Sequence, residues 1–488
     1  MIMPQIEKNL LVFLDPVPRW NDDVWRCISP DRLRDADARF KAIRHQNKNL
    51  VFSFQRHDLL GYLFCSLTAW FEARQHKKTV RKVLYLNDGL LSSIFATNNV
   101  SGYRAFARNH LTHQDGLRRQ LVRCIPPFWR AEQRFVTIEN IKTPETTDQT
   151  NDLAACDYLF FSNCRGKLML TQAKTFSSGN GLIFKTAATP GYAASLQHEQ
   201  SVVQEITKLL QQPGHLLGPQ EQLSTGRRTC FSEAYLAGKN LREVLRLLGK
   251  KHTYLDACQL LDRLDTWFSL YCSAFTDPKQ KISALYEPML QSFSELYDDD
   301  PDSMTTLQKA RELLEQLDLD NKEVIPITAH NDLWPGNFIL HGEQLTAIDW
   351  ERATGQSPPF FDYFWMIIAA VLEYYVGHSG VQDYSLAFRQ FLRQQDQVSI
   401  HAHHKLEEFL YQHGLGSQTL ASFMLLFLME WSIQGFKTLG KRTDMDLLAH
   451  GELVAFAVPA KEPFQPIDTQ QAGFYNTRAE FGVIRPNL

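Results

Sequence analysis

Residues 327–351, ITAHNDLWPGNFILHGEQLTAIDWE, constrain the fold of this chain more than any other stretch. They set His330, Asp332 and Asn337 in an H-x-D-x4-N pattern, and Asp349 follows after one short apolar segment. A proline–glycine pair between Asp332 and Asn337 breaks regular structure, which predicts a tight loop there rather than a helix. Two apolar segments joined by a polar turn then predict a β-hairpin between Asn337 and Asp349. The hairpin would bring these two side chains to one place.

The chemistry of these side chains fits phosphoryl transfer from a magnesium nucleotide. The transferred group spreads negative charge over its oxygens, so cations must neutralise it, and Mg²⁺ prefers oxygen ligands. Asn337 and Asp349 supply such oxygens and are the predicted metal ligands. Asp332 is the predicted base that orients the acceptor hydroxyl or takes its proton. Taken singly, each residue fits an ordinary turn or strand-end cap equally well, but the whole constellation in this order favours a catalytic site.

Length and composition bound the class of protein. A chain of 488 residues predicts two or three domains. No run approaches the ~20 consecutive apolar residues of a membrane helix, so no transmembrane segment is expected, and the nearest candidates, 364–372 and 420–429, predict buried helices. The N-terminal residues lack the features of a signal peptide. The eight cysteines show neither a C-x-x-C motif nor a metal-binding spacing, which predicts a reduced, cytoplasmic protein.

The net charge of −3 conceals an asymmetry along the chain. Residues 1–150 contain 23 Lys and Arg against 15 Asp and Glu, so this part carries +8 and the remainder −11. A basic part can bind an anionic partner. The simpler interpretation, which we favour, is that both parts are solvated or face each other, and no nucleic-acid partner is expected.

Residues 1–142 have the pattern of an α/β domain of unassigned role. No glycine-rich nucleotide-binding motif occurs in them, so no activity is predicted, and a second enzymatic activity is an alternative without a supporting motif. The polar stretch 143–152 lacks periodicity and predicts a linker. Strand-like segments are 10–14, 50–54, 83–86 and 135–138, and helix-like segments are 59–74 and 103–124.

The rest of the chain changes from a strand-rich to a helical pattern. Residues 153–235 are predicted to form a small β lobe with a hinge, residues 236–457 a helical part, and the proline-rich residues 458–488 an extended tail. Strands are predicted at 158–161, 167–171 and 181–186, followed by a helix at 193–210. Further helices are predicted at 241–248, 255–275, 282–296, 305–317, 361–375, 384–395, 404–413 and 419–439.

The motif region resembles the catalytic region of the aminoglycoside phosphotransferase and choline kinase family of kinase-like enzymes. Residues 330–337 look like the catalytic loop of that family, and residues 348–351 look like its metal-binding segment. Residues 355–362 resemble a later segment in which an aspartate, here Asp362, opens a helix and steadies the catalytic region. The resemblance covers about residues 155–450. It implies an α+β chain with a bilobal protein-kinase-like fold, a small β lobe and a large helical lobe, preceded by the α/β N-terminal domain.

The resemblance also implies which residues bind the nucleotide. In such enzymes a lysine of the third strand pairs with the phosphates, and Lys185 is the natural candidate ahead of Lys167 and Lys174. A glutamate of the following helix orients this lysine. Glu199 fits that position better than Glu205, and the two point in different directions on a helix.

Two further segments would contact the nucleotide. Ser162, Asn163 and Gly166 belong to the turn that corresponds to the loop over the phosphates, although it has fewer glycines than the family's form. Glu233 and Tyr235 belong to the segment that resembles the hinge, where adenine binds to backbone groups.

Together these features imply an ATP- and Mg²⁺-dependent phosphotransferase with Asp332 as the catalytic base and His330 as a structural support of the loop. The acceptor would be a hydroxyl of a small molecule, either a choline-like amino alcohol or a sugar. A cage for a quaternary ammonium could use aromatic residues, although core packing is the simpler explanation for most of them. The aromatic candidates are Trp334, Trp350, Tyr363, Trp365, Tyr374 and Tyr375. The alternative function is a non-catalytic nucleotide-binding or scaffolding module, which the sparse glycine loop and the long N-terminal region motivate.

Overall fold

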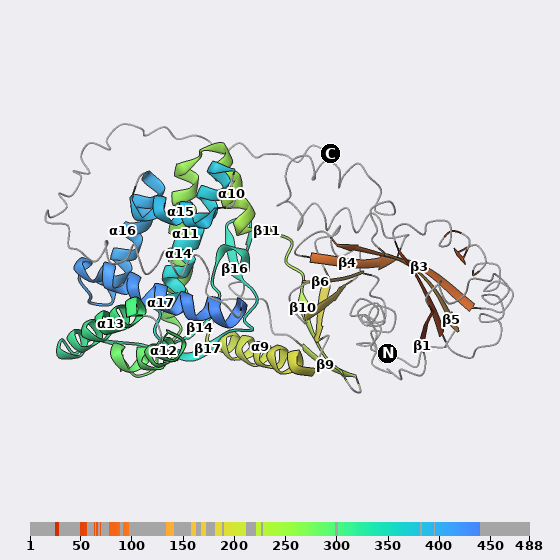
Figure 1. Ribbon diagram of the computed structural model, residues 1–488, viewed down its shortest axis with the longest axis horizontal. Coiled ribbons are helices and arrows are strands. Elements are labelled where there is room, and N and C mark those ends of the chain that lie inside the picture. Colours follow the sequence, from red (N-terminus) through yellow and green to blue (C-terminus); the bar gives the residue numbers. More distant parts are fainter. Residues whose placement is uncertain are drawn as a thin grey trace.

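The chain folds into a mixed arrangement of strands and helices, as the computed structural model shows (Figure 1). The described residues are 25–28, 49–55, 63, 65, 66, 69, 78–87, 91–96, 133–140, 158–162, 167–171, 181–187, 190–210, 221–225, 228–297, 301–380, 383–394 and 396–439. The predicted segments 10–14, 103–124, 143–152 and 458–488 lie outside the described residues.

A ten-stranded sheet has the order β1-β2-β5-β3-β4-β6-β7-β8-β10-β9. Strands β1 and β2 are parallel, and the other neighbouring pairs are antiparallel. The strands are β1 (Trp25–Ile28), β2 (Asn49–Gln55), β3 (Lys78–Asn87), β4 (Leu91–Ala96), β5 (Gln133–Asn140), β6 (Tyr158–Ser162), β7 (Lys167–Thr171), β8 (Leu182–Ala187), β9 (Glu221–Thr225) and β10 (Arg228–Ala234). Valine, isoleucine and aromatic residues, which fit a pleated surface, recur in these strands.

This sheet continues across the predicted linker. Strand β4 pairs with β6, and Ser93 lies opposite Phe160. The strands before and after residues 143–152 therefore share backbone hydrogen bonds, while those residues themselves lie outside the described part. The boundary between an N-terminal domain and a small lobe stays a prediction.

The predicted strands are confirmed wherever they fall on described residues. They are the segments 50–54, 83–86, 135–138, 158–161, 167–171 and 181–186. Within the predicted helix at 59–74, the described residues are helical.

Helices make up most of the described structure after residue 240. They are α9 (Pro190–Leu209), which packs on β8 and β10, α10 (Leu241–Lys251), α11 (Tyr254–Ser273), α12 (Ile282–Tyr297), α13 (Pro301–Leu319), α14 (Phe360–Ser379), α15 (Tyr384–Leu392), α16 (Gln397–Gln412) and α17 (Leu420–Leu439), with 3₁₀ turns η3 (Pro335–Asn337) and η4 (Ser417–Thr419). Each predicted helix from residue 193 onward is confirmed. Helix α16 begins earlier than the predicted residue 404, because Asp396 and Ser399 form a reciprocal capping box that the apolar periodicity did not reveal.

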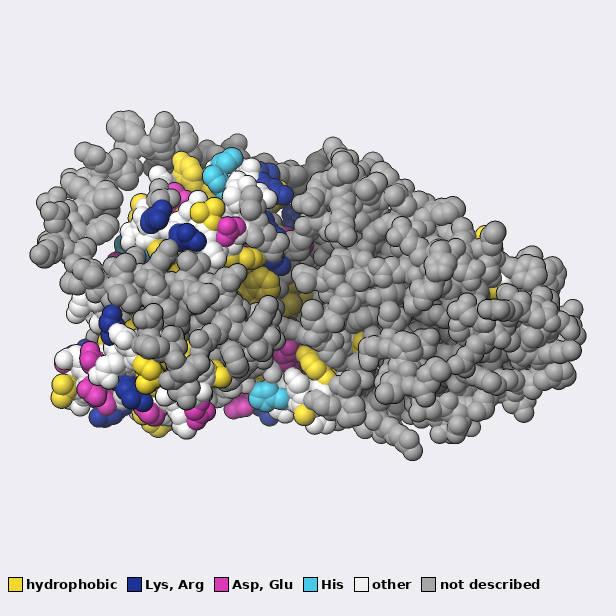
Figure 2. Space-filling model, in the orientation of Figure 1, with side chains coloured by type: hydrophobic (Ala, Val, Ile, Leu, Met, Phe, Trp, Pro, Cys, Tyr) yellow, Lys and Arg dark blue, Asp and Glu magenta, His cyan; other side chains and the backbone are white. Residues whose placement is uncertain are grey.

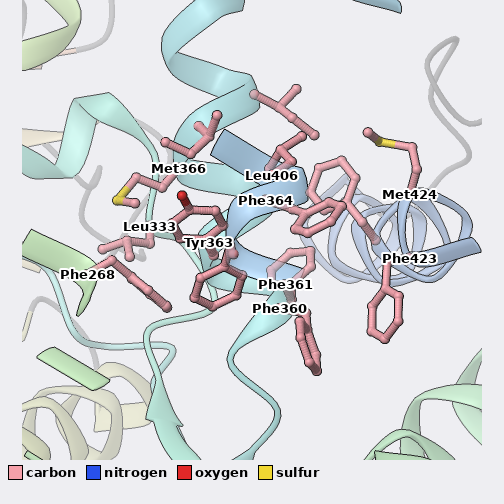
Figure 3. Packing of buried hydrophobic residues seen from close by; sticks show 14 of the residues in the cluster. Phe268, Leu333, Phe360, Phe361, Tyr363, Phe364, Met366, Leu406, Phe423 and Met424 are labelled. Atoms are coloured by element: carbon pink, nitrogen blue, oxygen red, sulfur yellow. The ribbon is translucent and has the colours of Figure 1, made fainter. Parts of the chain in front are cut away.

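Helix α14 packs against α10, α11, α15, α16 and α17. Figure 3 shows its aromatic side chains among the buried residues. The ring of Tyr363 stacks on that of Phe409 of α16, with 3.8 Å between the ring centroids. The ring centroids of Phe360 and of Phe423 of α17 lie 4.5 Å apart. Among the described helices, α14 is long and apolar enough to cross a membrane, but 94% of that window is buried inside the protein. The structure thus confirms a buried helix at 364–372.

Helices α10 and α14 cross at close range through glycines. A Cβ atom at Gly377 would lie 2.2 Å from the carbonyl oxygen of Arg246, so only glycine permits this approach. The crossing brings Arg246 onto Glu373, with Nε of the arginine 2.5 Å from Oε2 of the carboxylate. Arg242 binds the same carboxylate at 3.0 Å. This ion cluster fixes the start of α10, next to the residues of the motif.

Short strands carry the motif. Strands β11 (Lys239–Asn240), β15 (Phe338–His341) and β16 (Gln344–Ala347) form one small sheet, β14 (Ile327–Ala329) pairs with β17 (Thr354–Ser357), and β12 (Gln280–Lys281) pairs with β13 (Glu323–Val324). The predicted hairpin between Asn337 and Asp349 is confirmed, with Phe338 opposite Ala347.

Charged side chains are mixed over the described surface of the helical part. Figure 2 shows acidic residues beside basic ones on the described face. Lys405, for example, lies 3.2 Å from Asp262 and 3.1 Å from Glu408. Exposed pairs of this kind contribute only ~0–1 kcal/mol each. The mixture agrees with solvated charge rather than with a single acidic patch.

Candidate active site

The loop after β14 is fixed through the backbone of Asp332. Its carbonyl oxygen accepts a hydrogen bond from the backbone N–H of Trp334 at 2.9 Å and another from Nδ2 of Asn337 at 2.8 Å. A Cβ atom at Gly336 would lie 2.2 Å from the ring of Trp334, so a larger residue there would displace this ring. The tight loop predicted from the Pro335–Gly336 pair is therefore confirmed, and it holds the Asp332 side chain at a half-buried position.

Asp362, at the start of α14, ties the beginning of this loop to the helical core. Its oxygens accept the backbone N–H groups of His330 at 2.5 Å and of Asn331 at 2.9 Å. Asn331 has a φ of 59°, a left-handed conformation that asparagine tolerates better than most residues. Burial raises the pKa of Asp362 to about 7, with the negative charge of Asp332 adding to the rise and the two N–H groups opposing it.

His330 connects the loop to the residue before Asp349. The ring is fully buried, and its Nε2 donates to the carbonyl oxygen of Ile348 at 2.9 Å. Burial lowers the pKa of His330, which keeps the ring neutral. The ring also packs against Trp350, with 4.5 Å between centroids. These contacts agree with a positioning role for His330 and not with proton transfer to a substrate.

The hairpin brings Asp349 beside the catalytic loop. The backbone N–H of Ile348 donates to the carbonyl oxygen of Asn337 at 2.9 Å, so the two predicted metal ligands lie at the same end of the hairpin. Asp349 has a φ of 70°, which is uncommon for a residue with a side chain and recurs at functional sites. The side-chain amide nitrogen of Asn337 donates a hydrogen bond to the carbonyl oxygen of Asp332. The side-chain amide oxygen of Asn337 is therefore the atom suited to a metal ion.

Lys185 of β8 and Glu199 of α9 form a buried ion pair, the pairing that the sequence predicts. Nζ of Lys185 lies 2.8 Å from Oε1 of Glu199 and 2.7 Å from Oε2 of Glu233. Burial opposes the charge on Lys185, but the two carboxylates raise its pKa on balance. Burial likewise opposes the charge on Glu199, and Lys167 and Lys185 lower its pKa on balance. Burial is the largest cause that raises the pKa of Glu233.

Lys167, which the sequence ranks behind Lys185, has a larger part in this site than expected. Its Nζ lies 2.6 Å from Oδ1 of Asp349, 3.0 Å from Oε2 of Glu351 and 3.4 Å from Oε2 of Glu199. Burial opposes its charge, and these carboxylates raise the pKa of Lys167 well above its ordinary value. Lys167 thus joins strand β7 to the segment that carries Asp349.

The carboxylates around Lys167 form a donor set that fits a divalent metal ion. The oxygens of Glu199, Asp349 and Glu351 lie within 4.8 Å of one another. Hard oxygen ligands of this kind suit Mg²⁺. With Glu233, Lys167 and Lys185 included, four carboxylates face two ammonium groups, a formal excess of two negative charges that a divalent cation would balance.

The remaining nucleotide-site predictions have mixed outcomes. Ser162 is the last residue of β6, whereas Asn163 and Gly166 lie outside the described residues. In the predicted hinge, Glu233 directs its carboxylate to Lys185. The backbone N–H of Tyr235 donates to the carbonyl oxygen of Gly181 at 2.9 Å, so this donor is used within the protein.

The aromatic residues proposed for an ammonium cage are mostly in the core. Trp350, Tyr363, Tyr374 and Tyr375 are each at least 96% buried. The half-buried Trp334 carries the guanidinium of Arg242 over its ring, with Cζ 5.0 Å from the centroid. Core packing, the simpler of the two interpretations, therefore holds for most of the set.

Comparisons with known proteins add relatives of low identity. No family model matches the chain. Protein LicA of Haemophilus influenzae is 25% identical over 187 residues, which span 37% of this chain and 55% of LicA, so the match covers about half of that relative. Among solved structures, aminoglycoside phosphotransferase APH(4)-Ia in complex with ADP and hygromycin B gives a TM-score of 0.38 at 12% identity, covering 61% of this chain and 92% of that one. ADP-bound APH(2'')-Ib gives 0.36 at 13% identity, covering 63% and 95%.

These solved structures are aminoglycoside phosphotransferases, the group that the motif region resembles. The contacts of Glu351, Tyr192 and His198 were not predicted. Glu351 accepts a hydrogen bond from Tyr192 and pairs with Lys167, and Nε2 of His198 contacts the carbonyl oxygen of Ala353 at 2.7 Å. The sequence could have indicated a role for Glu351, because it is a second acidic residue two positions after Asp349. Its partners on α9 and β7 could not be inferred, because they are more than 150 residues away.

Exchanging Glu199 for glutamine is expected to destabilise the fold strongly. The carboxylate is 1% exposed and contacts both lysines, so Glu199→Gln leaves a buried ion network without one partner, a change of ~3–5 kcal/mol in the free energy of unfolding. Glu205→Gln on the exposed face of the same helix is the matched control and is expected to stay within ~0.5 kcal/mol. Urea unfolding of both variants measures the difference. Equal stabilities would show that the Lys185–Glu199 pair contributes nothing to the fold.

Proposed function

We propose that the chain is an ATP- and Mg²⁺-dependent phosphotransferase that acts on a hydroxyl of a small molecule. One observation supports this proposal above the others: the catalytic-loop residues, Asp349 and the Lys185–Glu199 pair are joined by short contacts into one site. The donors and acceptors of that site are the groups that phosphoryl transfer requires.

Each side chain has a defined part in the proposed reaction. The acceptor oxygen attacks the γ-phosphorus, and the bond from that phosphorus to the bridging oxygen of ADP breaks. Asp332 orients the acceptor hydroxyl and receives its proton. Lys185, held by Glu199, neutralises phosphate oxygens of the nucleotide. Asp349 and the amide oxygen of Asn337 would hold Mg²⁺, which supplies positive charge to the phosphate oxygens when bound.

The acceptor class stays open between a choline-like amino alcohol and a sugar. Burial of the predicted cage residues weakens the argument for a quaternary ammonium, since the ring of Trp334 already faces Arg242. The proposed compartment is the cytoplasm, because the described cysteines form no disulfide. An anionic partner for residues 1–150 stays a prediction.

A ligand-stabilisation screen tests the proposal. Mg²⁺ with ATP is expected to stabilise the protein by ~2.7 kcal/mol at a hundred times its dissociation constant, and a cognate acceptor adds a further increment. The panel contains ATP, GTP, amino alcohols, sugars and nucleosides, and ADP formation is followed with each acceptor that stabilises. Lys185→Met is the control variant and is expected to lose the nucleotide-dependent increment.

Two results would count against this function. Stabilisation by nucleotide without ADP formation for any acceptor would favour the non-catalytic module. An unchanged thermal midpoint with every Mg²⁺-nucleotide would refute nucleotide binding altogether.

A further inference from the structure

The position of Lys167 carries a consequence for how the metal and the nucleotide bind. Its side chain is 7% exposed, and its ammonium group lies where the oxygens of Asp349, Glu351 and Glu199 converge. The same three carboxylates form the donor set that fits a divalent ion. The ammonium group of Lys167 therefore occupies the place among these carboxylates that a metal ion would take.

A metal ion and the ammonium group compete for Oδ1 of Asp349. Nζ lies 2.6 Å from Oδ1 of Asp349, whereas Mg²⁺ binds oxygen at 2.0–2.1 Å and requires several ligands around it. Two cations on one carboxylate oxygen would repel each other inside a buried site. Binding of the metal thus requires Lys167 to leave.

The covalent position of Lys167 indicates where it goes. It is the first residue of β7, directly after the turn that the sequence predicts to lie over the phosphates. A lysine stem is long and flexible, and phosphate oxygens are the anions that a displaced ammonium group would meet beside Asp349. Lys185 differs in this respect, because it pairs with Glu199 at 2.8 Å and with Glu233 at 2.7 Å.

We propose that Lys167 is a displaceable internal cation: it pairs with Asp349 and Glu351 before the metal binds, and it pairs with the nucleotide phosphates afterwards. The exchange rests on the proposed phosphotransferase function. It makes binding of the free metal weak and makes binding of the metal–nucleotide complex favourable, since the displaced charge then finds a new anion. Lys167 would thereby couple the two ligands.

Titration with free Mn²⁺ tests the first half of the exchange without any activity measurement. Mn²⁺ takes the same oxygen ligands as Mg²⁺. In the absence of nucleotide, Lys167→Met is expected to bind MnCl₂ about tenfold more tightly than wild type in isothermal titration calorimetry, a change of ~1.4 kcal/mol. Lys281→Met, which removes an exposed lysine that pairs with Asp318, is the matched control and is expected to bind MnCl₂ like wild type. If the methionine variant fails to fold, Lys167→Gln replaces it, because this substitution also removes the positive charge.

Titration with Mg²⁺ and ATP tests the second half. Lys167→Met and Lys185→Met are both expected to bind ATP about tenfold more weakly at saturating Mg²⁺. Free Mn²⁺ affinity of Lys167→Met within twofold of wild type would overturn the competition, as would an equal gain in Lys281→Met. If wild type binds no nucleotide, the proposed function fails and the phosphate half fails with it, whereas the competition for Asp349 is still decided by the Mn²⁺ arm.

Discussion

Asp332→Asn is expected to lower turnover by ~10²–10⁴-fold while leaving nucleotide binding almost unchanged. The substitution removes the proton acceptor and keeps the shape of the side chain. The backbone carbonyl of Asp332 accepts the hydrogen bonds from Trp334 and Asn337, so these two residues retain their partner. The fold and the nucleotide site should therefore survive.

The measurement is the initial rate of ADP formation with the acceptor found in the screen, together with the shift of the thermal midpoint by Mg²⁺ and ATP. A normal midpoint shift with lost turnover identifies a catalytic group rather than a structural one. Turnover above a tenth of wild type would remove Asp332 from the role of base. Loss of both signals would instead show that the asparagine disturbs the loop.

Asp362→Ala is expected to destabilise the protein by ~2–6 kcal/mol and to lower turnover as well. The substitution leaves the buried backbone N–H groups of His330 and Asn331 without their acceptor, and each unsatisfied donor costs ~1–3 kcal/mol. Since those groups begin the catalytic loop, a shift there also moves Asp332, and displacements of about 1 Å can reduce rates ~10²-fold.

Asp383→Ala provides the comparison for this effect. Asp383 also accepts a backbone N–H at the start of a helix, but it is exposed and remote from the motif in the sequence. Its replacement should cost ~1 kcal/mol and leave turnover unchanged. Urea unfolding measures the loss of stability in each variant, and initial rates measure the loss of turnover. Equal losses of stability in the two variants would mean that Asp362 is an ordinary helix cap.

The contribution of Asp362 also depends on pH with a definite sign. Burial raises its pKa in the folded state to about 7, above the ordinary value near 3.8 in the unfolded chain. The folded state therefore binds more protons, and the stability that this group contributes is present at low pH and is lost as pH rises towards 7. The difference in unfolding free energy between wild type and Asp362→Ala should be larger at pH 5 than at pH 8. A difference that grows with pH would contradict the raised pKa.

Local features were predictable because they depend on neighbours in the sequence. The tight loop follows from Pro335–Gly336, and the hairpin follows from two apolar segments around a polar turn. The helices from residue 193 onward follow from apolar periodicity, whereas the Lys185–Glu199 pair was implied by the resemblance to kinase-like enzymes.

Long-range contacts decided the rest. The pairing of β4 with β6 joins strands on either side of the predicted linker, and no local pattern specifies which strand edges meet. The burial of Trp350 and Tyr363 depends on which helices cover them, so composition alone allowed a ligand cage. Lys167 pairs with Asp349, which is 182 residues further along the chain. Residue spacing in the sequence does not predict contacts at such a separation.

Local sequence patterns indicated Asp332, Asn337 and Asp349 as candidate site residues, because turns and short strands set their spacing, and the family resemblance implied Lys185 and Glu199. Only the tertiary structure decided how charges are shared among them. Electrostatic pairing depends on distance and burial, and these were fixed by the packing of β7, β8 and α9 against the residues after the hairpin. That packing gave Lys167 its position on the metal-site carboxylates.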